Sequence, residues 1–519
     1  MTSEQDEQKM TIETVERTVR EDSKYYGRQI QSALVPILST VVTGMTMGYS
    51  AILLPQLKVV SFNDTETREK ESYVTNSIVT GDSGIIIHSI DEESWIAASA
   101  ALTMAPGCWF ASLLMDKLGR KTSILVISPV VLFGWLTIAL GQNFVYLVAG
   151  RLLCGLSAGL FGATSPVYIA ETTHPRLRGL LITALSFAVT VGILFVHALG
   201  TWLDWRLTAF ITSVIPIACM GLGVFIPESP NWLLSRGKRE DALAAWTLLR
   251  GDHSVSQFDE LKAIHEPSAR EVECDYVEKR SKVGFTLDSK SSMCWTNRFS
   301  LRAFFVPLLI VCVMSFTSQF SGINVVTFYC VQMIQEVSGP KHGYVGTLIL
   351  DVVRVLFSVF ACWLTRRYSR RILAMISGFG TCIMLFFLSV CIFNDFGRPW
   401  LPIVLLFVYA GTVAVGLGPL PWLLCAELFD DNNRGLGSGL SAGFAFLCFF
   451  AVVKTGPQAF NVLTPAGTFA LYGMVALLGS LFLYRYLPET KDKTLRDIEK
   501  SFTDETSPED DKSTVTTDL

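Results

Sequence analysis

The sequence predicts an all-α membrane protein of twelve transmembrane helices, in two six-helix halves joined by a cytoplasmic helical linker. Half of the 519 residues are hydrophobic and 17% are charged, whereas a soluble protein carries about 25% charged residues. Twelve apolar runs are each long enough to cross a bilayer, which needs about 20 residues. Landmark motifs also occur twice, about 250 residues apart, which is typical of transporters built from two parallel repeats.

The repeat is clearest in two stretches, 150–179 and 416–435, because both end with the same pattern of residues. Each ends in a glutamate, six further residues and an Arg-Gly pair, with the charged residues Glu171 and Arg178, and Glu427 and Arg434. Two more motifs recur at a similar spacing, DKLGRK at 116–121 as RRYSRR at 366–371, and PES at 227–229 as PET at 488–490. The chain is therefore interpreted as two copies of one six-helix unit.

The predicted spans fall into two groups of six, at residues 32–55, 93–115, 122–141, 143–170, 178–200, 206–226, 303–335, 343–365, 372–394, 399–425, 436–457 and 466–487. They divide the chain into an N-terminal tail 1–31, a first half 32–227, a linker 228–302, a second half 303–487 and a C-terminal tail 488–519. The linker contains the amphipathic pattern SRGKREDALAAWTLLRGD. This pattern predicts short helices beneath the membrane.

Lysine and arginine in the short loops predict the orientation. They gather before the first span and after the second, fourth and eighth spans. Because such residues favour the cytoplasmic side, we expect both termini in the cytoplasm and the protein in the plasma membrane. The loop 57–92 is then external and contains Asn63 in an Asn-Asp-Thr sequon, a candidate for glycosylation. The start MTSEQDEQKM is polar, so we expect no cleavable signal peptide there.

Several other functions are not indicated. The sequence has no GxxxxGK[ST] phosphate loop, so ATP hydrolysis is not the expected energy source. The segment GLSAG at 155–159 matches a hydrolase nucleophile elbow but lies within an apolar span, and we interpret it as helix packing. The twelve cysteines and six histidines show no metal-ligand spacing. We therefore expect no enzymatic activity, cofactor, metal or nucleic-acid partner, and a monomer that works in the lipid bilayer.

Charged residues at the predicted ends of spans suggest a cytoplasmic gate. Charges near the membrane edge are tolerated when they are paired. We interpret them as ion pairs that hold the two halves together on the inside and break when the halves rock. The alternative is that they only set the topology. The candidates are Asp116, Arg120, Arg151, Glu171, Arg178, Arg367, Glu427 and Arg434.

Six segments carry a family resemblance: DKLGRK, PVYIAE, PESPNWLL, SQFSGIN, GLGPLPWLLCAELF and PETKDKTL. They resemble signatures of the sugar porter family within the major facilitator superfamily. GILFVHALG, GPLPWLL and the tripeptide Val453-Lys454-Thr455 resemble the insect branch that includes trehalose facilitators. The resemblance implies a facilitative transporter, or uniporter, that moves a sugar by alternating access. Its substrate would be a hexose or a disaccharide such as trehalose.

The resemblance places sugar contacts on Gln319 and Asn324 in the seventh span. In an unbroken helix the two side chains lie about 140° apart. Gly322 between them allows a break that would turn both toward one cavity. An aromatic contact to the sugar ring is expected from Trp422. Further candidates are the hydroxyl side chains Ser186, Thr190 and Ser318. The alternative is that these polar residues tie helices together and that the tryptophan is a core residue.

Five expected sugar contacts of the glucose-carrying members are replaced in this chain, by Ser186, Ser318, Arg354, Ala414 and Phe446. The replacements put glucose in doubt and favour a roomier cavity. Arg354 is unusual because a lone charge is costly in the membrane. With Asp351 one turn before it, it is interpreted as a self-contained ion pair or as a contact to a substrate hydroxyl or anionic group.

In the family that this chain resembles, the proton-coupled members have a Gly-Tyr-Asp tripeptide at the middle of the first span. This chain has Gly48-Tyr49-Ser50 at that place. No carboxylate lies between residues 33 and 56, and Asp351 is expected to stay ionised beside Arg354. We therefore expect transport without ion coupling. Three alternatives remain open: a proton-coupled symporter, a carrier of another small polar or anionic solute, and a sugar receptor that does not transport.

Overall fold

The computed structural model describes residues 2–59, 85–87, 89–251, 254–265, 301–338, 343–394, 400–429 and 434–490. The first half consists of α1 (Thr2–Gln56), α3 (Ile90–Leu118), α4 (Arg120–Ala139), α5 (Phe144–Thr172), α6 (Pro175–Trp202), α7 (Trp205–Thr212) and α8 (Val214–Gly223). The linker contributes α9 (Pro230–Ser235), α10 (Arg239–Arg250) and α11 (Val255–His265). The second half consists of α14 (Leu301–Phe320), α15 (Ile323–Ser338), α16 (Gly343–Arg367), α17 (Arg370–Asn394), α18 (Trp400–Val415), α19 (Leu420–Glu427) and α20 (Arg434–Tyr486).

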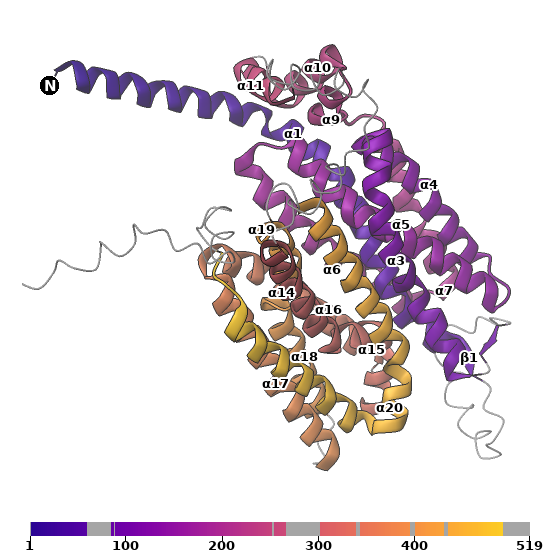
Figure 1. The fold of residues 1–519 in the computed structure, drawn as a ribbon. Coiled ribbons are helices and arrows are strands. Elements are labelled where there is room, and N and C mark those ends of the chain that lie inside the picture. The colour runs from indigo at the N-terminus through magenta and orange to yellow at the C-terminus, as the bar shows by residue number, and fades with distance from the viewer. Residues whose placement is uncertain are drawn as a thin grey trace, which may run out of the picture.

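The two halves lie side by side, the first in indigo to magenta and the second in orange to yellow (Figure 1). The helices α9, α10 and α11 cap one end of the bundle, which we call the linker end. At the opposite end two short strands, β1 (Lys58–Val59) and β2 (Ile86–Ile87), pair in parallel between α1 and α3. We call this the strand end. These strands are the one feature of the described residues that an all-helical prediction did not include.

Eleven helical segments of the described residues are long and apolar enough to cross a membrane. The last of them, Leu436–Tyr486, has 51 residues. A continuous helix of that length would measure roughly 75 Å, more than twice the apolar thickness of a bilayer. Thr464 within it has a non-helical backbone, with φ of 63°, and Pro465 follows directly. The segment therefore crosses twice, and the predicted twelve spans are confirmed.

Small residues let the helices of the first half pack backbone to backbone. A Cβ atom added at Gly155 would lie 2.0 Å from the Ala100 carbonyl oxygen, and one at Gly159 would lie 2.1 Å from that of Met104. Both glycines lie on α5 and face α3. The segment 155–159 is therefore a helix-packing motif, as expected, rather than a nucleophile elbow.

The linker helices form a small core of their own. Leu233 and Leu234 on α9, Trp246 on α10 and Phe258 on α11 are buried together. This unit also contacts α1, because the side-chain amide of Gln29 donates a hydrogen bond to the Leu249 carbonyl oxygen at 3.1 Å. The amphipathic pattern of the linker thus folds into short helices, as the sequence predicted, and they dock against the bundle.

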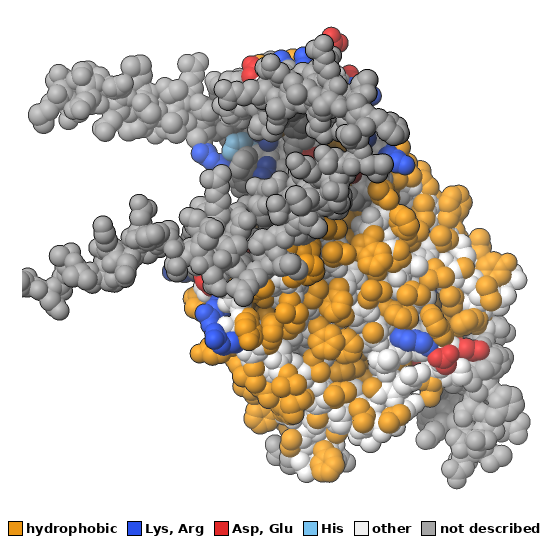
Figure 2. Space-filling view, viewed as in Figure 1, with side chains coloured by type: hydrophobic (Ala, Val, Ile, Leu, Met, Phe, Trp, Pro, Cys, Tyr) orange, Lys and Arg blue, Asp and Glu red, His pale blue; other side chains and the backbone are white. Residues whose placement is uncertain are grey.

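Apolar side chains dominate the face of the bundle between its two ends, and charged side chains lie mainly near those ends (Figure 2). Large exposed apolar residues occur along the length of the spans, for example Phe133, Phe225 and Phe393. A protein surface of this kind is suited to lipid rather than to water.

Candidate functional site

The seventh span is broken where the sequence predicted it. Helix α14 ends before Gly322, whose φ is 86°, and α15 begins after it. A side chain at Gly322 would overlap the ring of Tyr472, at 2.4 Å. The neighbouring Ser321 carbonyl oxygen accepts a hydrogen bond from the Tyr409 hydroxyl at 2.7 Å. Two tyrosines of other helices therefore hold the break in place.

The break brings Gln319 and Asn324 into contact. The Asn324 side-chain amide donates a hydrogen bond to the Gln319 side-chain oxygen, and both residues are half-buried. This contact uses one donor and one acceptor. The Gln319 amino group and the Asn324 oxygen have no further partner in the described part of the chain, so they can donate to and accept from a hydroxyl group. We call these two side chains the amide pair.

Arg354 on α16 contacts α15 one helical turn after Asn324 of the amide pair. Its guanidinium donates a hydrogen bond to the Thr327 hydroxyl at 2.7 Å, and Thr327 lies one turn after Asn324 on α15. The predicted ion pair between Arg354 and Asp351 is wrong. Asp351 turns instead toward α6, where its carboxylate lies 2.5 Å from His197. The structure therefore leaves Arg354 with a neutral partner.

The other candidates surround this region less tightly. Ser318 is buried beside Gln319. On α6, which packs against α16, Ser186 is exposed, and Thr190 is half-buried and bonds the Phe187 carbonyl oxygen of its own helix at 2.8 Å. No described hydrogen bond joins either α6 hydroxyl to the amide pair.

Trp422 lies beyond the break between α18 and α19. Its side chain is 44% exposed, and its ring lies 5.5 Å from that of Phe446 at an angle of 46°. Phe446 is one of the replaced positions, so this chain pairs two aromatic rings where the resembling glucose carriers have a tryptophan at the second position. The exposed face of Trp422 is available to a ligand.

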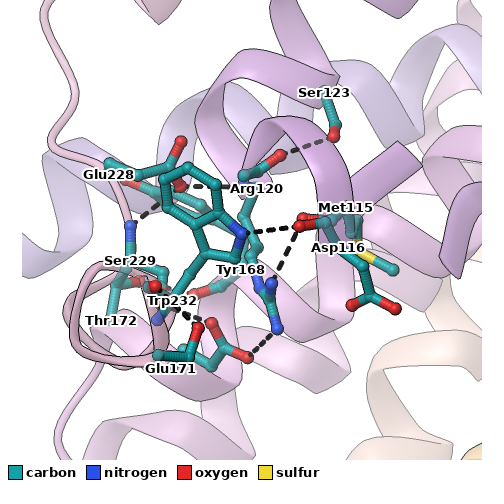
Figure 3. Close-up of polar contacts among 12 residues, drawn as sticks. Met115, Asp116, Arg120, Ser123, Tyr168, Glu171, Thr172, Glu228, Ser229 and Trp232 are labelled. Atoms are coloured by element: carbon teal, nitrogen blue, oxygen red, sulfur yellow. Dashed lines mark hydrogen bonds and ion pairs between the residues drawn. The ribbon is translucent and has the colours of Figure 1, made fainter. Parts of the chain in front are cut away.

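At the linker end, one polar cluster joins α3, α4 and α5 of the first half to the start of the linker at residues 228–232 (Figure 3). Arg120 at the start of α4 pairs with Glu171 at the end of α5, with 2.9 Å between nitrogen and oxygen. Ser229 donates to the other oxygen of Glu171. Glu228 accepts hydrogen bonds from the backbone amides of Arg120 at 2.7 Å and Lys121 at 2.9 Å. We call this the first linker-end cluster.

The second half contains the same cluster. Arg370 pairs with Glu427 at 3.1 Å, and Thr490 donates to the second oxygen of Glu427 at 2.6 Å. Glu489 accepts from the backbone amides of Arg370 at 3.0 Å and Arg371 at 3.2 Å. Each residue of this second linker-end cluster stands where the repeat places its counterpart of the first.

The predicted gate needs two corrections here. Both ion pairs join helices of the same half, so they do not hold the two halves together. The partner of Glu427 is Arg370, which was not among the gate candidates, and the candidate Arg367 is exposed. The repeat contained the signal, because Arg120 and Arg370 are the fifth residues of the two matching loops. Glu228 and Glu489 were likewise visible in the repeated PES and PET motifs.

The remaining gate candidates make different contacts. Asp116 is exposed, and its backbone carbonyl oxygen accepts from the Trp232 indole at 3.0 Å. Arg178 is half-buried, and its Nε is enclosed without a hydrogen-bond partner among the residues that the structure describes. The side chain of Arg434 and the glycosylation candidate Asn63 lie outside the described residues.

Arg151 is not at the linker end, which corrects the third part of the gate prediction. It is fully buried on α5 and bonds four oxygens of α1 and α3. Its guanidinium donates to the Thr46 carbonyl at 2.5 Å and the Ser50 hydroxyl at 2.6 Å, and also to the carbonyls of Ile96 and Ala97. Because Ile96 and Ala97 are near the start of α3, Arg151 lies toward the strand end. Its role is to connect three helices of the first half.

Sequence reasoning missed the contacts that join the two halves toward the strand end. Lys454 on α20 bonds Asp91 and, at 2.7 Å, the Ser94 hydroxyl of α3. Gln332 on α15 donates to Glu93 on α3 at 2.8 Å. These residues lie outside the repeated motifs, so the pattern that revealed the linker-end clusters gave no signal for them.

A family model described as "Sugar (and other) transporter" matches residues 32–502 of this chain. The chain belongs to this family. The resemblance inferred from the motifs is thereby confirmed. Among relatives in this family, the facilitated trehalose transporter Tret1 of Aedes aegypti is 30% identical over 91% of this chain and 55% of its own length. Tret1 of Culex quinquefasciatus is 30% identical over 91% of this chain and 85% of its own.

The chain spans about half the length of several such relatives, for example 51% of Tret1 from Drosophila mojavensis, to which it is 29% identical. Among solved structures, the xylose transporter XylE from E. coli in a partially occluded inward open conformation matches with a TM-score of 0.69. The match covers 90% of this chain and 99% of XylE at 22% identity. This likeness shows that the chain has the fold of XylE.

Proposed function

We propose that this family member is a facilitative sugar transporter that moves its substrate by alternating access, with a hexose or a disaccharide such as trehalose as substrate. The observation that carries the proposal is the broken seventh span with its amide pair. A discontinuous helix that presents polar groups inside a two-half bundle is a general device for binding a small polar substrate in a membrane. The names of the insect relatives support trehalose.

The proposed substrate contacts are Gln319 and Asn324 for hydroxyl groups and Trp422 for the apolar face of a sugar ring. Ser186, Thr190, Ser318 and Arg354 complete the set in the surrounding helices. Each hydrogen bond from the amide pair would contribute about 1 kcal/mol to binding. The substrate would exchange sides when the halves rock about this region.

We propose that transport is not coupled to protons. Ser50 stands where resembling proton-coupled porters have a carboxylate, and it is bonded to Arg151 at 2.6 Å. A serine hydroxyl does not titrate in the accessible pH range, so this position cannot carry a proton across the membrane. The substrate would then move only down its own gradient.

We place the linker end in the cytoplasm and the strand end outside, in the plasma membrane. This orientation agrees with the positive residues that gather in the loops of the linker end. It also places Asn63, between α1 and α3, on the outside, where it would be glycosylated. The proposed working unit is a monomer, with the halves formed by 32–227 and 303–487 and the linker 228–302 between them.

The test is uptake of radiolabelled sugars by cells that have no sugar transport of their own, with a panel of glucose, trehalose and sugar acids. We expect uptake of at least one neutral sugar, and Gln319→Leu should reduce it with normal surface expression. Thr317→Val is the matched control, because the Thr317 hydroxyl bonds only its own helix in the described residues. No uptake of any sugar by well-expressed protein would contradict the proposal and would favour a receptor.

One observation favours a second candidate, transport of an anionic solute. Asp351, the acid nearest in sequence to Arg354, is engaged with His197, and Arg354 bonds the neutral Thr327. A guanidinium inside a membrane bundle is stabilised by an anion. Selective uptake of the sugar acids, lost in Arg354→Asn, would support this candidate over a neutral sugar.

A further inference from the structure

A buried histidine and a buried aspartate connect the two halves. His197 lies on α6 of the first half and Asp351 on α16 of the second, and their side chains are 1% and 2% exposed. The His197 Nδ1 atom lies 2.5 Å from an Asp351 carboxylate oxygen. On its other side, the His197 Nε2 atom lies 2.8 Å from the Gly48 carbonyl oxygen of α1. The imidazole is thus held between two oxygens that belong to different halves.

The approach to α1 depends on the residue at position 48. A Cβ atom added at Gly48 would lie 3.0 Å from the His197 Nε2 atom and 2.9 Å from a methyl of Val196. A larger residue would push the imidazole away from the carbonyl oxygen. Gly48 therefore allows His197 to bond the backbone of α1 and Asp351 at the same time.

Both contacts of the imidazole can be hydrogen bonds only when the pair binds one proton more than a neutral imidazole and an ionised carboxylate hold. The Gly48 carbonyl oxygen can only accept, so Nε2 must carry the hydrogen that it receives. The contact between Nδ1 and the carboxylate also needs a hydrogen, either on Nδ1 of an imidazolium or on the carboxyl group of Asp351. A neutral imidazole beside an ionised carboxylate has one hydrogen for two acceptors. The second contact would then be two facing lone pairs, which repel.

We propose that His197 and Asp351 form a proton-binding site between the halves, and that a bound proton favours the conformation closed at the strand end. When the halves separate there, the pair is broken and the extra proton is free to leave. Because the closed state holds one proton more than the open state, acid favours closure and alkali favours opening. The closed-to-open ratio would change by up to about tenfold per pH unit.

The neighbours of the pair fit a local proton site. On α15 the thiol of Cys330 lies near both Asp351 and the guanidinium of Arg354, which is one turn along α16. On α1 the pair faces the backbone of Gly48, and on α6 the His197 carbonyl oxygen accepts from the Thr201 hydroxyl at 2.8 Å.

The site differs from a proton carrier of a symporter. The pair lies near the strand-end termini of α6 and α16 and opens when that end opens, so the proton returns to the side from which it came. For its effect on transport the inference rests on the proposed alternating-access function. External pH would change how fast the strand end reopens, and it would leave the final distribution of the substrate unchanged.

The test measures the strand end directly, without a substrate. Spin labels at Ile90→Cys and Thr455→Cys, in purified protein whose other accessible cysteines are replaced by serine, report the distance between α3 and α20. Both sites are exposed. From about pH 5 to about pH 9 we expect the short-distance population to fall. His174→Gln, which removes a histidine near the linker end, is the control and should titrate as the unaltered protein does.

Two variants separate a proton site from a simple contact. Asp351→Asn supplies an amide hydrogen to Nδ1 without any bound proton, so the short distance should persist at all pH values. His197→Leu removes the contact, so the long distance should dominate at all pH values. A pH titration that is absent in the unaltered protein, or unchanged in Asp351→Asn, would overturn the proposal.

An uptake arm distinguishes failure of this inference from failure of the proposed function. If the distances titrate as expected and no sugar is taken up, the proton site stands and the transport function fails. If sugar is taken up with a rate that is independent of external pH while the distances do not titrate, the transport function stands and the proton site fails.

Discussion

The linker end and the strand end of this bundle are held by polar contacts of different kinds. At the linker end, Arg120 with Glu171 and Arg370 with Glu427 form the same cluster twice, and each cluster lies within one half. Toward the strand end, Lys454 with Asp91 and His197 with Asp351 occur once, and each contact joins the two halves. The repeated contacts stabilise each half as a unit, and the single contacts determine how the halves sit against each other.

This difference separates residues that a transporter needs to fold from residues that set its conformational equilibrium. A contact inside one half survives every step of alternating access, so its loss should lower stability in all states. A contact between halves exists in one state only, so its loss should shift the balance between states. The two classes can therefore be distinguished by measuring stability and conformation on the same variants.

The largest loss of stability is expected on substitution of Arg151, a charged residue near the strand end whose hydrogen bonds all lie within the first half. Arg151→Leu leaves the Ser50 hydroxyl and three carbonyl oxygens without their donor, at a cost of about 3 kcal/mol. Thermal unfolding of purified protein in detergent should show a clear fall in Tm. Arg151→Lys keeps the positive charge but has fewer hydrogen-bond donors, so its Tm should fall less than that of Arg151→Leu. An unchanged Tm in Arg151→Leu would show that the contacts between α1, α3 and α5 do not depend on it.

The linker-end clusters should show matched losses of stability. Arg120→Gln leaves Glu171 without its cation, and Arg370→Gln does the same to Glu427, each at about 1–3 kcal/mol. The exchanged pair Arg120→Glu with Glu171→Arg should recover part of the Tm. If Arg120→Gln instead opened the linker end without lowering Tm, the cluster would act between conformations and the comparison would be wrong.

A contact between the halves should behave in the opposite way. Lys454→Met removes the bonds to Asp91 and Ser94 and the cation that lies 4.6 Å from the Trp95 ring. We expect a shift toward the open strand end, seen as longer distances between the spin-label sites at 90 and 455, with a small change in Tm. The matched control is Ser441→Ala, whose hydroxyl bonds the Gly437 carbonyl oxygen of its own helix at 2.7 Å. Equal behaviour of the two variants would remove Lys454 from the interface.

The smallest effect tests only the orientation. Asn63→Gln should abolish the gel shift that enzymatic deglycosylation produces in the unaltered protein, and it should leave uptake and Tm unchanged. A shift that persists in this variant would assign the sugar chain elsewhere, and the absence of any shift in the unaltered protein would remove the support for an external loop at 57–92.

Much of the fold could be predicted because the membrane imposes lengths. Apolar runs gave the twelve spans, and the repeat gave the two halves. The break at Gly322 was also predictable, because a glycine stood between two polar residues that had to face one way. The repeat further contained the partner of Glu427, because Arg370 stands where the first half has Arg120, although the gate prediction did not include Arg370.

The partners of the charges inside the bundle could not be predicted in the same way. Asp351 lies one turn from Arg354 in sequence, which suggested a local ion pair. The Asp351 side chain instead points toward α6, which packs on α16, and its carboxylate contacts His197. Arg151 was predicted to lie at the cytoplasmic end of a span and to belong to the gate. Backbone carbonyl oxygens of α1 and α3 accept its hydrogen bonds. Because every residue has a backbone carbonyl group, the sequence does not indicate which ones will accept.

The most direct test of the account is the final distribution of substrate across a sealed membrane. Protein reconstituted in liposomes is given the labelled sugar that the panel identifies, at several external pH values and with or without a protonophore. We expect internal and external concentrations to become equal in every case, with external pH altering only the rate. Accumulation above the external concentration that the protonophore abolishes would contradict facilitative transport and would assign proton coupling to this carrier.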